Sequence, residues 1–358
     1  MRIGHVAILC CLHFLLLTSA SVAAEMSVKQ TGELKDAIAV SSDFSIYAER
    51  IKTGKRIFDY VLMIKEVSSG KELKPLDWEK DWGDPKDAFF SPDGKKLAIL
   101  WGEVGKLKTA RVFDVGSGEM KLNVRHEMLK FVAFTPDSKR LVSVGGPGAS
   151  NPKETLWIWD VETRQKIIIE SPSTPTCLAF SLDQKLVVTA HEQYAFDQPL
   201  LTACEVATGK RVATINREGK ENAVAVAFSP DSKLLAAGTR DGVIKLFEVT
   251  KGKNVTGKGI GKDGKKFDVG VLKKVGSFDD IQDEILGVAF HPTENLIAAT
   301  GKDKTIRFWD LKSKKLVSTT KLPTRYFKLH LQFSIDGAQL ATIAGNGITL
   351  WTVEVRKQ

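Results

Sequence analysis

The chain repeats one pattern of strand, tight turn and strand at long intervals. The segments "VAFSPDSKLLAAGTRDGVIKLFEV" (226–249) and "VAFHPTENLIAATGKDKTIRFWDL" (288–311) correspond position by position. Their short apolar runs predict strands, and the Ser-Pro-Asp and Asp-Gly pieces predict tight turns. One such segment cannot bury both faces of its own sheet, so several copies must pack against one another.

Seven copies are present along the chain. Each has a first anchor ending in a turn, at 39–43, 89–93, 133–137, 179–183, 227–231, 289–293 and 332–336. A second anchor of the type "IWDV" follows each first anchor at a regular distance. Successive copies lie 43 to 50 residues apart, with one interval of 62. A second turn and a fourth strand fit in the remaining residues of each interval.

Four antiparallel strands in about 45 residues are typical of one blade of a β-propeller. We therefore predict an all-β fold, a single seven-bladed propeller of four-stranded antiparallel blades over residues 25–358. The blades are expected near 39–66, 89–114, 133–160, 179–205, 227–248, 289–310 and 332–352, with a basic insertion at 250–270.

The motifs "IWD" (158–160) and "FWD" (308–310) carry a Trp-Asp dipeptide, and the repeat resembles that of the WD40-repeat family over nearly all of residues 25–358. This resemblance implies a structural role for Asp241 and Asp303, which would bond turn amides between second and third strands. The sequence departs from the family where Lys65 and Cys204 replace the tryptophan. His126 stands near the family's histidine position but lacks the preceding glycine.

The seventh copy ends with its third strand, so its fourth strand must come from elsewhere. Residues 26–31 precede the opening strand of the first copy, in the place of a fourth strand. We predict that they complete the last blade beside residues 349–355 and close the ring.

The first 24 residues are predicted to be a signal peptide. Arg2 precedes an apolar run of 12 residues at 6–17, and small residues follow up to Ala24. As a helix this run would span ~18 Å, short of the ~30 Å core of a bilayer. Cleavage near Ala24 would yield an exported protein, periplasmic or secreted; the alternative is an uncleaved anchor.

Cys177 and Cys204 are the only cysteines after the predicted cleavage point. The repeat places them on the first and third strands of one blade, ~10 Å apart, which is too far for a disulfide. We expect two buried free thiols.

Long connections between second and third strands in the first four blades predict a built-up top face. Trp78, Trp82, Trp101, Tyr194 and Phe196 fall on or beside these connections and are the candidate partner-binding residues. Alternatively, these rings fold inward and cap the blade ends.

The interval of 62 residues contains a Gly- and Lys-rich insertion after the third strand of the fifth blade. Lys258, Lys262, Lys265 and Lys266 are candidates for contact with an anionic surface; a solvated loop is the alternative. Predicted export and the absence of interleaved aromatic residues argue against nucleic acid.

Motifs for catalysis are missing. The sequence holds no Gly-x-Ser-x-Gly elbow, no His-Glu-x-x-His pair and no phosphate-binding loop. The histidines after residue 24 are spread over the chain, although His330 could line the central channel. We expect no catalytic residues, no metal and no cofactor.

The first hypothesis is a non-enzymatic scaffold of the cell envelope or exterior, monomeric, that binds a protein partner on the top face of blades 1 to 4. The second is a propeller hydrolase or lactonase with a metal in the central channel. Inner-strand residues weigh against the second, because Phe131, Cys177, Ala225 and Gly287 are apolar or small. The third is an envelope-assembly protein that binds an anionic surface through the lysine-rich insertion.

Overall fold

The computed structural model describes residues 25–54, 60–73, 75–76, 85–101, 109–126, 129–145, 155–171, 175–191, 199–219, 221–250, 258–260, 266–268, 272–281, 283–323, 329–344 and 347–356. These residues form strands and turns. Within them there is no helix that could cross a bilayer. The predicted signal peptide, residues 1–24, lies outside the described residues.

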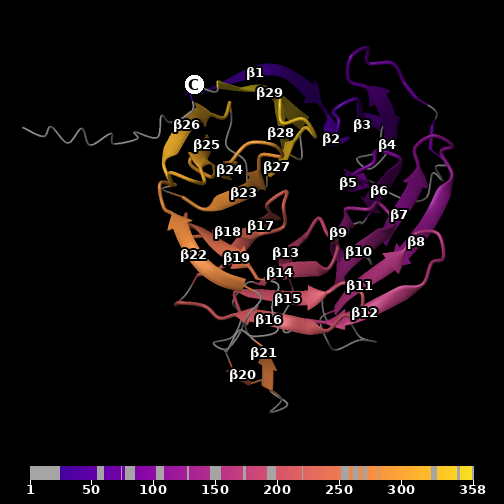
Figure 1. The fold of residues 1–358 in the computed structure, drawn as a ribbon. Helices are drawn as coiled ribbons and strands as arrows, with labels where there is room; N and C mark the ends of the chain where they lie inside the picture. Colours follow the sequence, from indigo (N-terminus) through magenta and orange to yellow (C-terminus); the bar gives the residue numbers. More distant parts are fainter. Residues whose placement is uncertain are drawn as a thin grey trace, which may run out of the picture.

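Seven antiparallel sheets surround a central axis, and the chain visits them in order around the ring (Figure 1). From the axis outward, blade 1 consists of β2 (Ala37–Val40), β3 (Ile46–Lys52) and β4 (Tyr60–Glu66). Blade 2 consists of β5 (Pro85–Phe90), β6 (Lys96–Trp101), β7 (Thr109–Asp114) and β8 (Met120–Arg125). Blade 3 consists of β9 (Leu129–Phe134), β10 (Arg140–Gly145), β11 (Thr155–Asp160) and β12 (Lys166–Glu170).

Blades 4 to 7 follow the same order. Blade 4 consists of β13 (Pro175–Phe180), β14 (Leu186–His191), β15 (Leu201–Glu205) and β16 (Arg211–Ile215), and blade 5 of β17 (Ala223–Phe228), β18 (Leu234–Thr239), β19 (Ile244–Val249) and β22 (Leu272–Phe278). Blade 6 consists of β23 (Ile285–Phe290), β24 (Leu296–Gly301), β25 (Thr305–Asp310) and β26 (Leu316–Lys321). Blade 7 consists of β27 (His330–Phe333), β28 (Gln339–Ala344), β29 (Gly347–Arg356) and β1 (Glu25–Lys35).

The predicted all-β, seven-bladed propeller is confirmed. Blade 1 is the least regular blade: three of its strands are described, and an isolated bridge between Lys65 and Glu72 takes the position of the fourth. The insertion contributes β20 (Lys258–Ile260) and β21 (Lys266–Asp268), a two-stranded hairpin that stands outside the ring (Figure 1).

The ring is closed by the predicted pairing of distant chain segments. Strand β1 lies antiparallel to β29 as the outermost strand of blade 7, with Val28 opposite Val353 and Leu34 opposite Ile348. The pairing extends from Glu25 to Lys35, beyond the predicted residues 26–31. Blade 7 therefore combines strands from both ends of the described chain.

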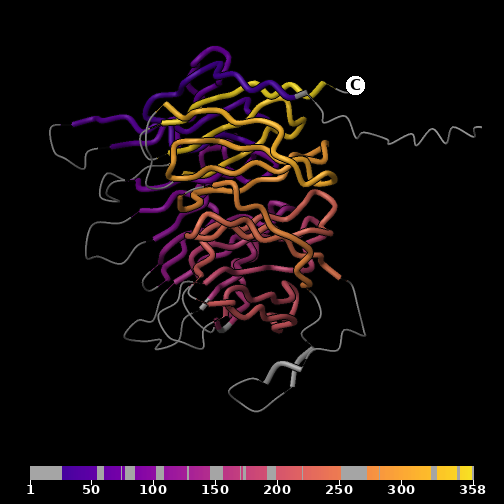
Figure 2. Tube along the Cα trace, turned by 90° about the vertical axis from the view of Figure 1, so that its left-hand side faces the viewer, coloured from indigo at the N-terminus to yellow at the C-terminus, as the bar shows by residue number. Residues whose placement is uncertain are grey.

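The strands run between two faces of the ring, as the side view shows (Figure 2). We call the face with the connections between blades, and between second and third strands, the top face. The bottom face carries the turns between first and second strands and between third and fourth strands. Strand β29 ends on the bottom face, so Glu25, which pairs with Arg356, lies there as well.

A repeated hydrogen-bonded turn explains why the Ser-x-Asp motif joins first and second strands. In blade 2, the Ser91 hydroxyl donates to Asp93 Oδ1 at 2.6 Å and accepts the backbone N–H of Lys96 at 2.9 Å. Ser or Thr makes the equivalent bond to Asp in every blade except blade 6. Since these bonds satisfy the turn locally, the motif specifies the turn wherever it occurs.

Apolar side chains fill each interface between neighbouring blades. Seven separate buried clusters are present, one for each of the seven interfaces. Between blades 6 and 7, for example, Phe308 packs in the same cluster as Trp351. Each sheet is thus covered on both faces by its neighbours, which makes the ring a rigid body.

The second-anchor residue of each blade packs against the preceding blade. Phe113, Phe247 and Trp309 do so in blades 2, 5 and 6, and Cys204 takes this place in blade 4. Lys65, the equivalent residue of blade 1, forms an ion pair with Glu49 instead, with Nζ 2.9 Å from Oε2. The departures noted in the sequence therefore replace apolar packing with a smaller side chain or with charge.

Candidate functional site

The innermost strands of blades 2 to 7 line a cavity of about 570 Å³ on the ring axis. Phe131, Cys177, Ala225 and Gly287 all line it, as the sequence pattern predicted. His330 lines it too, and its ring meets that of Phe89 edge to face, with centroids 6.3 Å apart. The cavity wall combines polar and apolar surface in about equal amounts.

Charged side chains gather toward the top face of this cavity. Lys130 lies near the beginning of β9, where the strand enters from the top face, and its side chain is exposed. Glu284 Oε1 lies 3.3 Å from Arg240 Nε, and its other oxygen lies 2.5 Å from Lys302 Nζ. One carboxylate is therefore shared by two cations at this rim.

The Cys177 thiol is unreactive. Burial raises its pKa to about 12, and the Thr176 hydroxyl contacts Sγ at 3.9 Å. Burial likewise raises the pKa of Cys204 to about 11. Both are free thiols, as predicted, although Cys177 is only half-buried. At neutral pH both stay protonated, and the thiol is a weak nucleophile.

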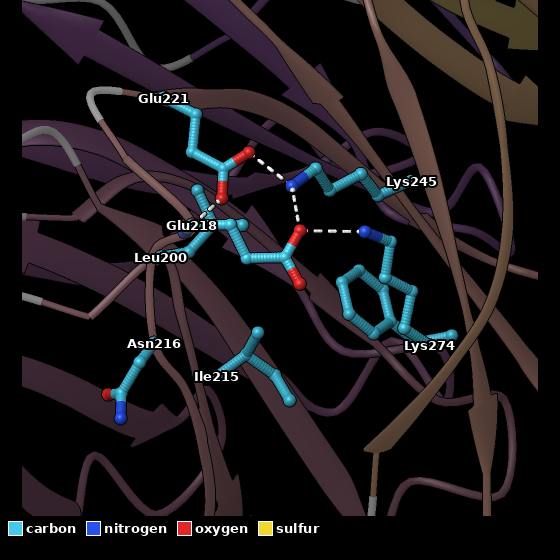
Figure 3. A pocket seen from close by; sticks show the side chains of 8 residues that line it. Leu200, Ile215, Asn216, Glu218, Glu221, Lys245 and Lys274 are labelled. Atoms are coloured by element: carbon cyan, nitrogen blue, oxygen red, sulfur yellow. Dashed lines mark hydrogen bonds and ion pairs between the residues drawn. The ribbon is translucent and has the colours of Figure 1, made fainter.

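A second, smaller pocket of about 190 Å³ lies between blades 4 and 5 near the top face (Figure 3). Lys245 is buried there and forms ion pairs with Glu221 and, at 3.2 Å, with Glu218. Glu218 also pairs with Lys274 at 2.7 Å. Figure 3 shows the two carboxylates and two ammonium groups pointing toward one another, so their charges cancel.

These ion pairs govern the titration of the pocket. Burial by itself would lower the pKa of Lys245, but hydrogen bonds to Glu221 and Glu218 outweigh it and raise that pKa above its ordinary value. Hydrogen bonds from Lys274 and Lys245 lower the pKa of Glu218. Both shifts favour the charged forms of Lys245 and Glu218, and the ion pairs link the two blades.

An apolar groove of about 290 Å³ lies on the bottom face across blades 2 to 4. Pro92, Pro136 and Leu182 line it at equivalent turn positions. Leu182 is 53% exposed, and Ile335 is 70% exposed at the same position of blade 7. The sequence carried a signal for this feature, because Leu and Ile replace the usual proline at these two turns.

Hydrogen bonds to tryptophan indoles connect strands and blades near the top face. In blade 3, Trp159 Nε1 donates to Ser143 Oγ at 3.1 Å, and the same hydroxyl lies 3.0 Å from His126 Nδ1. His126 stacks on Trp157 with ring centroids 3.8 Å apart. In blade 6, Trp309 Nε1 donates to Asp280 at 2.7 Å instead.

The model of the family described as "WD domain, G-beta repeat" matches residues 209–248 and 272–310. These two segments are WD40 repeats. Each begins on the fourth strand of one blade and ends on the third strand of the next: β16 to β19 in the first, β22 to β25 in the second. A WD40 repeat is therefore offset from a blade by one strand, which agrees with the closure of blade 7 by β1.

Three curated relatives share similarity with parts of this chain. Small ribosomal subunit protein RACK1y of Oryza sativa subsp. japonica is 27% identical over 218 residues, covering 59% of this chain and 52% of the relative. Poly(A)+ RNA export protein of Schizosaccharomyces pombe is 26% identical over 166 residues, covering 37% of this chain and 46% of the relative. SEC12-like protein 2 of Arabidopsis thaliana is 26% identical over 201 residues, covering 53% of this chain and 47% of the relative. The chain spans about half the length of these relatives.

The propeller places Trp101 in the core rather than on the surface. Its side chain is 1% exposed at the end of β6 and meets the ring of Phe113 edge to face, with centroids 6.1 Å apart. Trp101 is thus not part of an exposed aromatic patch; it caps the blade end from within. Of the other candidates, Trp78, Trp82, Tyr194 and Phe196 lie outside the described residues.

The four candidate lysines of the insertion are only partly placed. Lys258 begins β20 and Lys266 begins β21, and nothing is described of their side chains. Lys262 and Lys265 lie outside the described residues.

The two turn aspartates differ in what they bond. Asp303 Oδ1 accepts the backbone N–H of Thr305 at 3.1 Å, and Asp303 Oδ2 pairs with Arg307. The described residues show no bond from the Asp241 carboxylate to a turn amide. Thr239 closes that turn instead, since its hydroxyl accepts the N–H of Val243 at 3.2 Å.

A metal site would need several ligands on neighbouring strands. Among the described residues, no three His, Cys, Asp or Glu side chains are close enough together to hold an ion. The features that sequence reasoning missed are the charged rim around Glu284 and the neutral pocket around Lys245. Both join residues from neighbouring blades, so no local motif reveals them.

Proposed function

We propose that this chain is a non-enzymatic protein-interaction scaffold. The observation that carries the proposal is that each blade interface is filled by its own apolar cluster. The ring is therefore rigid, and the blades differ mainly in the connections that they present at its faces. Variable connections on a rigid body suit recognition of other molecules. The rice relative is a protein of the small ribosomal subunit, which supports a role within an assembly.

We further propose that the partner binds on the top face of blades 1 to 4. The long connections in this part of the chain include Trp78, Trp82, Tyr194 and Phe196. Aromatic side chains are enriched in the centre of protein interfaces, because they bury a large apolar area with few rotatable bonds.

The proposal for the site in the cell rests on the sequence alone. We propose export to the envelope or the exterior after cleavage near Ala24. N-terminal sequencing of the protein recovered from cells tests this: a chain that begins at Glu25 supports export, and an intact Met1 contradicts it.

Affinity capture tests the scaffold proposal. Baits would begin at Glu25 and be incubated with an envelope extract. The test variant is Trp78→Ala with Trp82→Ala; Trp101 stays unchanged because its loss would open a cavity in the core. The matched control is Leu182→Ala with Ile335→Ala, which removes exposed apolar groups from the bottom face.

A partner that the control retains and the test variant loses supports a scaffold acting through the top face, provided that both baits melt like the parent chain. A partner retained by both variants places the interface elsewhere. Failure to capture any partner contradicts the scaffold proposal.

A further inference from the structure

The axial cavity contains a cation that has no anionic partner among the described residues. Lys130 lines the cavity from β9, and no carboxylate in the described part of the chain pairs with it. The lysines of the interblade pocket differ in this respect, because Lys245 and Lys274 are both held by glutamates. An unpaired ammonium group inside a concave site is available to a ligand.

The charged residues that line the cavity carry an excess of positive charge. Glu284 is the acidic residue among those that line the cavity, and Arg240 and Lys302 already share its two oxygens. Among the residues that line the cavity, the two cations Lys130 and Arg240 therefore stand against one carboxylate. Because Glu284 is already paired, a negative charge placed near Lys130 would gain electrostatic energy from this excess.

Apolar side chains contribute about half of the cavity wall. Phe89, Phe131, Leu178 and Val226 contribute to it from four different blades. The Thr176 hydroxyl is already used, since it donates to the carbonyl oxygen of Ala223 at 2.8 Å. A cavity of about 570 Å³ falls within the range of ligand pockets.

We propose that the axial cavity binds a carboxylate carried on an apolar body, with the carboxylate at Lys130 and the body along the apolar side chains of the wall. The carboxylate could belong to a free aliphatic acid or to the C-terminus of an apolar peptide. The inference is independent of the scaffold proposal, because the cavity lies on the axis and involves none of the aromatic residues of the top-face connections.

Isothermal titration calorimetry with ligands that differ only in their head group tests the proposal. The probes are octanoate, 1-octanol and octylamine, which share one apolar body. A second pair is an apolar hexapeptide with a free or an amidated C-terminus. The protein is the chain from Glu25, as the parent and as Lys130→Gln. Lys139→Gln is the matched control, because Lys139 is an exposed lysine of the same blade on the bottom face.

We expect saturable octanoate binding that weakens as salt is added, because the charges are solvent-accessible. Binding of 1-octanol should be weaker, and binding of octylamine weaker still. Lys130→Gln should weaken octanoate about fivefold and leave 1-octanol unchanged, while Lys139→Gln changes neither. If the free-terminus hexapeptide binds more tightly than octanoate and the amidated one does not, the ligand is a peptide terminus.

Three results would overturn the proposal. These are no saturable binding of octanoate or of the free-terminus peptide at millimolar concentration, equal affinity for octanoate and 1-octanol, and equal octanoate affinity in the parent and Lys130→Gln. Capture of a protein partner would not alter these readings, so the two proposals can fail separately.

Discussion

His291 in blade 6 reaches across the blade interface to Gly337 in blade 7, with Nε2 3.1 Å from the carbonyl oxygen. Its other nitrogen, Nδ1, lies 3.0 Å from the backbone nitrogen of Glu294. Because Nδ1 accepts that N–H, the proton of the neutral ring must be on Nε2, which donates to Gly337. Blade 6 is the one blade without the Ser-x-Asp turn bond, and a histidine both closes the turn and joins it to the next blade.

Replacing this histidine should weaken the junction of blades 6 and 7. His291→Ser is expected to lower the free energy of unfolding by about 2 kcal/mol, since it leaves a void and an unsatisfied carbonyl oxygen. Adding Thr293→Asp should restore part of the loss, because the pair recreates the Ser-x-Asp turn of the other blades. Urea unfolding at neutral pH measures both. A double variant no better than His291→Ser would contradict this account of the turn.

Gly337 is required for a steric reason as well. Its φ is +77°, and an added Cβ would lie 2.2 Å from His291 Cε1. Gly337→Ala should cost about 3 kcal/mol, with a smaller loss in the His291→Ser background. Gly94→Ala is the matched control: φ is +69°, but the nearest atom would be 3.9 Å away, so about 1 kcal/mol is expected. Equal costs at the two glycines would exclude the clash as the cause.

Stability should fall in acid through His191. This side chain is fully buried, and burial, with the charges of Arg217 and Arg211, lowers its pKa to about 3. The unfolded chain, with an ordinary pKa near ~6.5, binds a proton that the folded chain excludes between these values. The free energy of unfolding therefore rises with pH across this window. The contribution of His191, on the order of 4 kcal/mol in total, is lost as the pH falls through the window.

The measurement is the urea midpoint of the parent and of His191→Gln from pH 7 to pH 4. The slope of unfolding free energy against pH should be smaller in the variant by up to about one proton. Identical slopes would show that His191 does not carry the acid sensitivity.

The buried ion pair of Lys245 and Glu221 should show strong coupling. Lys245→Met is expected to cost about 3–5 kcal/mol, because it leaves the Glu221 carboxylate buried without its cation. Lys245→Met with Glu221→Leu should cost less than the sum of the single changes. Lys233→Ala, which breaks the exposed contact with Asp231, is the control and should cost under about 0.5 kcal/mol. Additive losses in the double variant would contradict a buried pair.

Closure of the ring by β1 can be tested by removal of that strand. Met26 and Val28 pack on the cluster between blades 6 and 7. Deleting residues 25–31 should cost at least about 3 kcal/mol, since this apolar contact and the ladder with β29 are both lost. A synthetic peptide of residues 25–35 should restore part of the lost stability. Unchanged thermal unfolding after the deletion would show that β1 does not lock the ring.

Much of the fold could be predicted from the sequence because its determinants are local. The alternation of apolar residues and the Ser-x-Asp turn act over a few residues, so the sequence of each copy specifies its own strands and turn. Counting strands in the last copy was enough to assign β1 to blade 7, since a blade with a missing strand must borrow one. The sequence by itself thus determined the number of blades and the closure of the ring.

The tertiary structure alone decided how neighbouring blades meet. Trp101 looked like a surface residue beside a long connection, but it is buried because blade 1 covers that end of β6. His291 and Gly337 are 46 residues apart, and the Lys245 cluster joins strands to a connection between blades. Lys130 became a candidate only when six innermost strands enclosed a cavity. Burial and pairing of this kind depend on residues in a neighbouring blade, and a pattern within a single repeat does not include those residues.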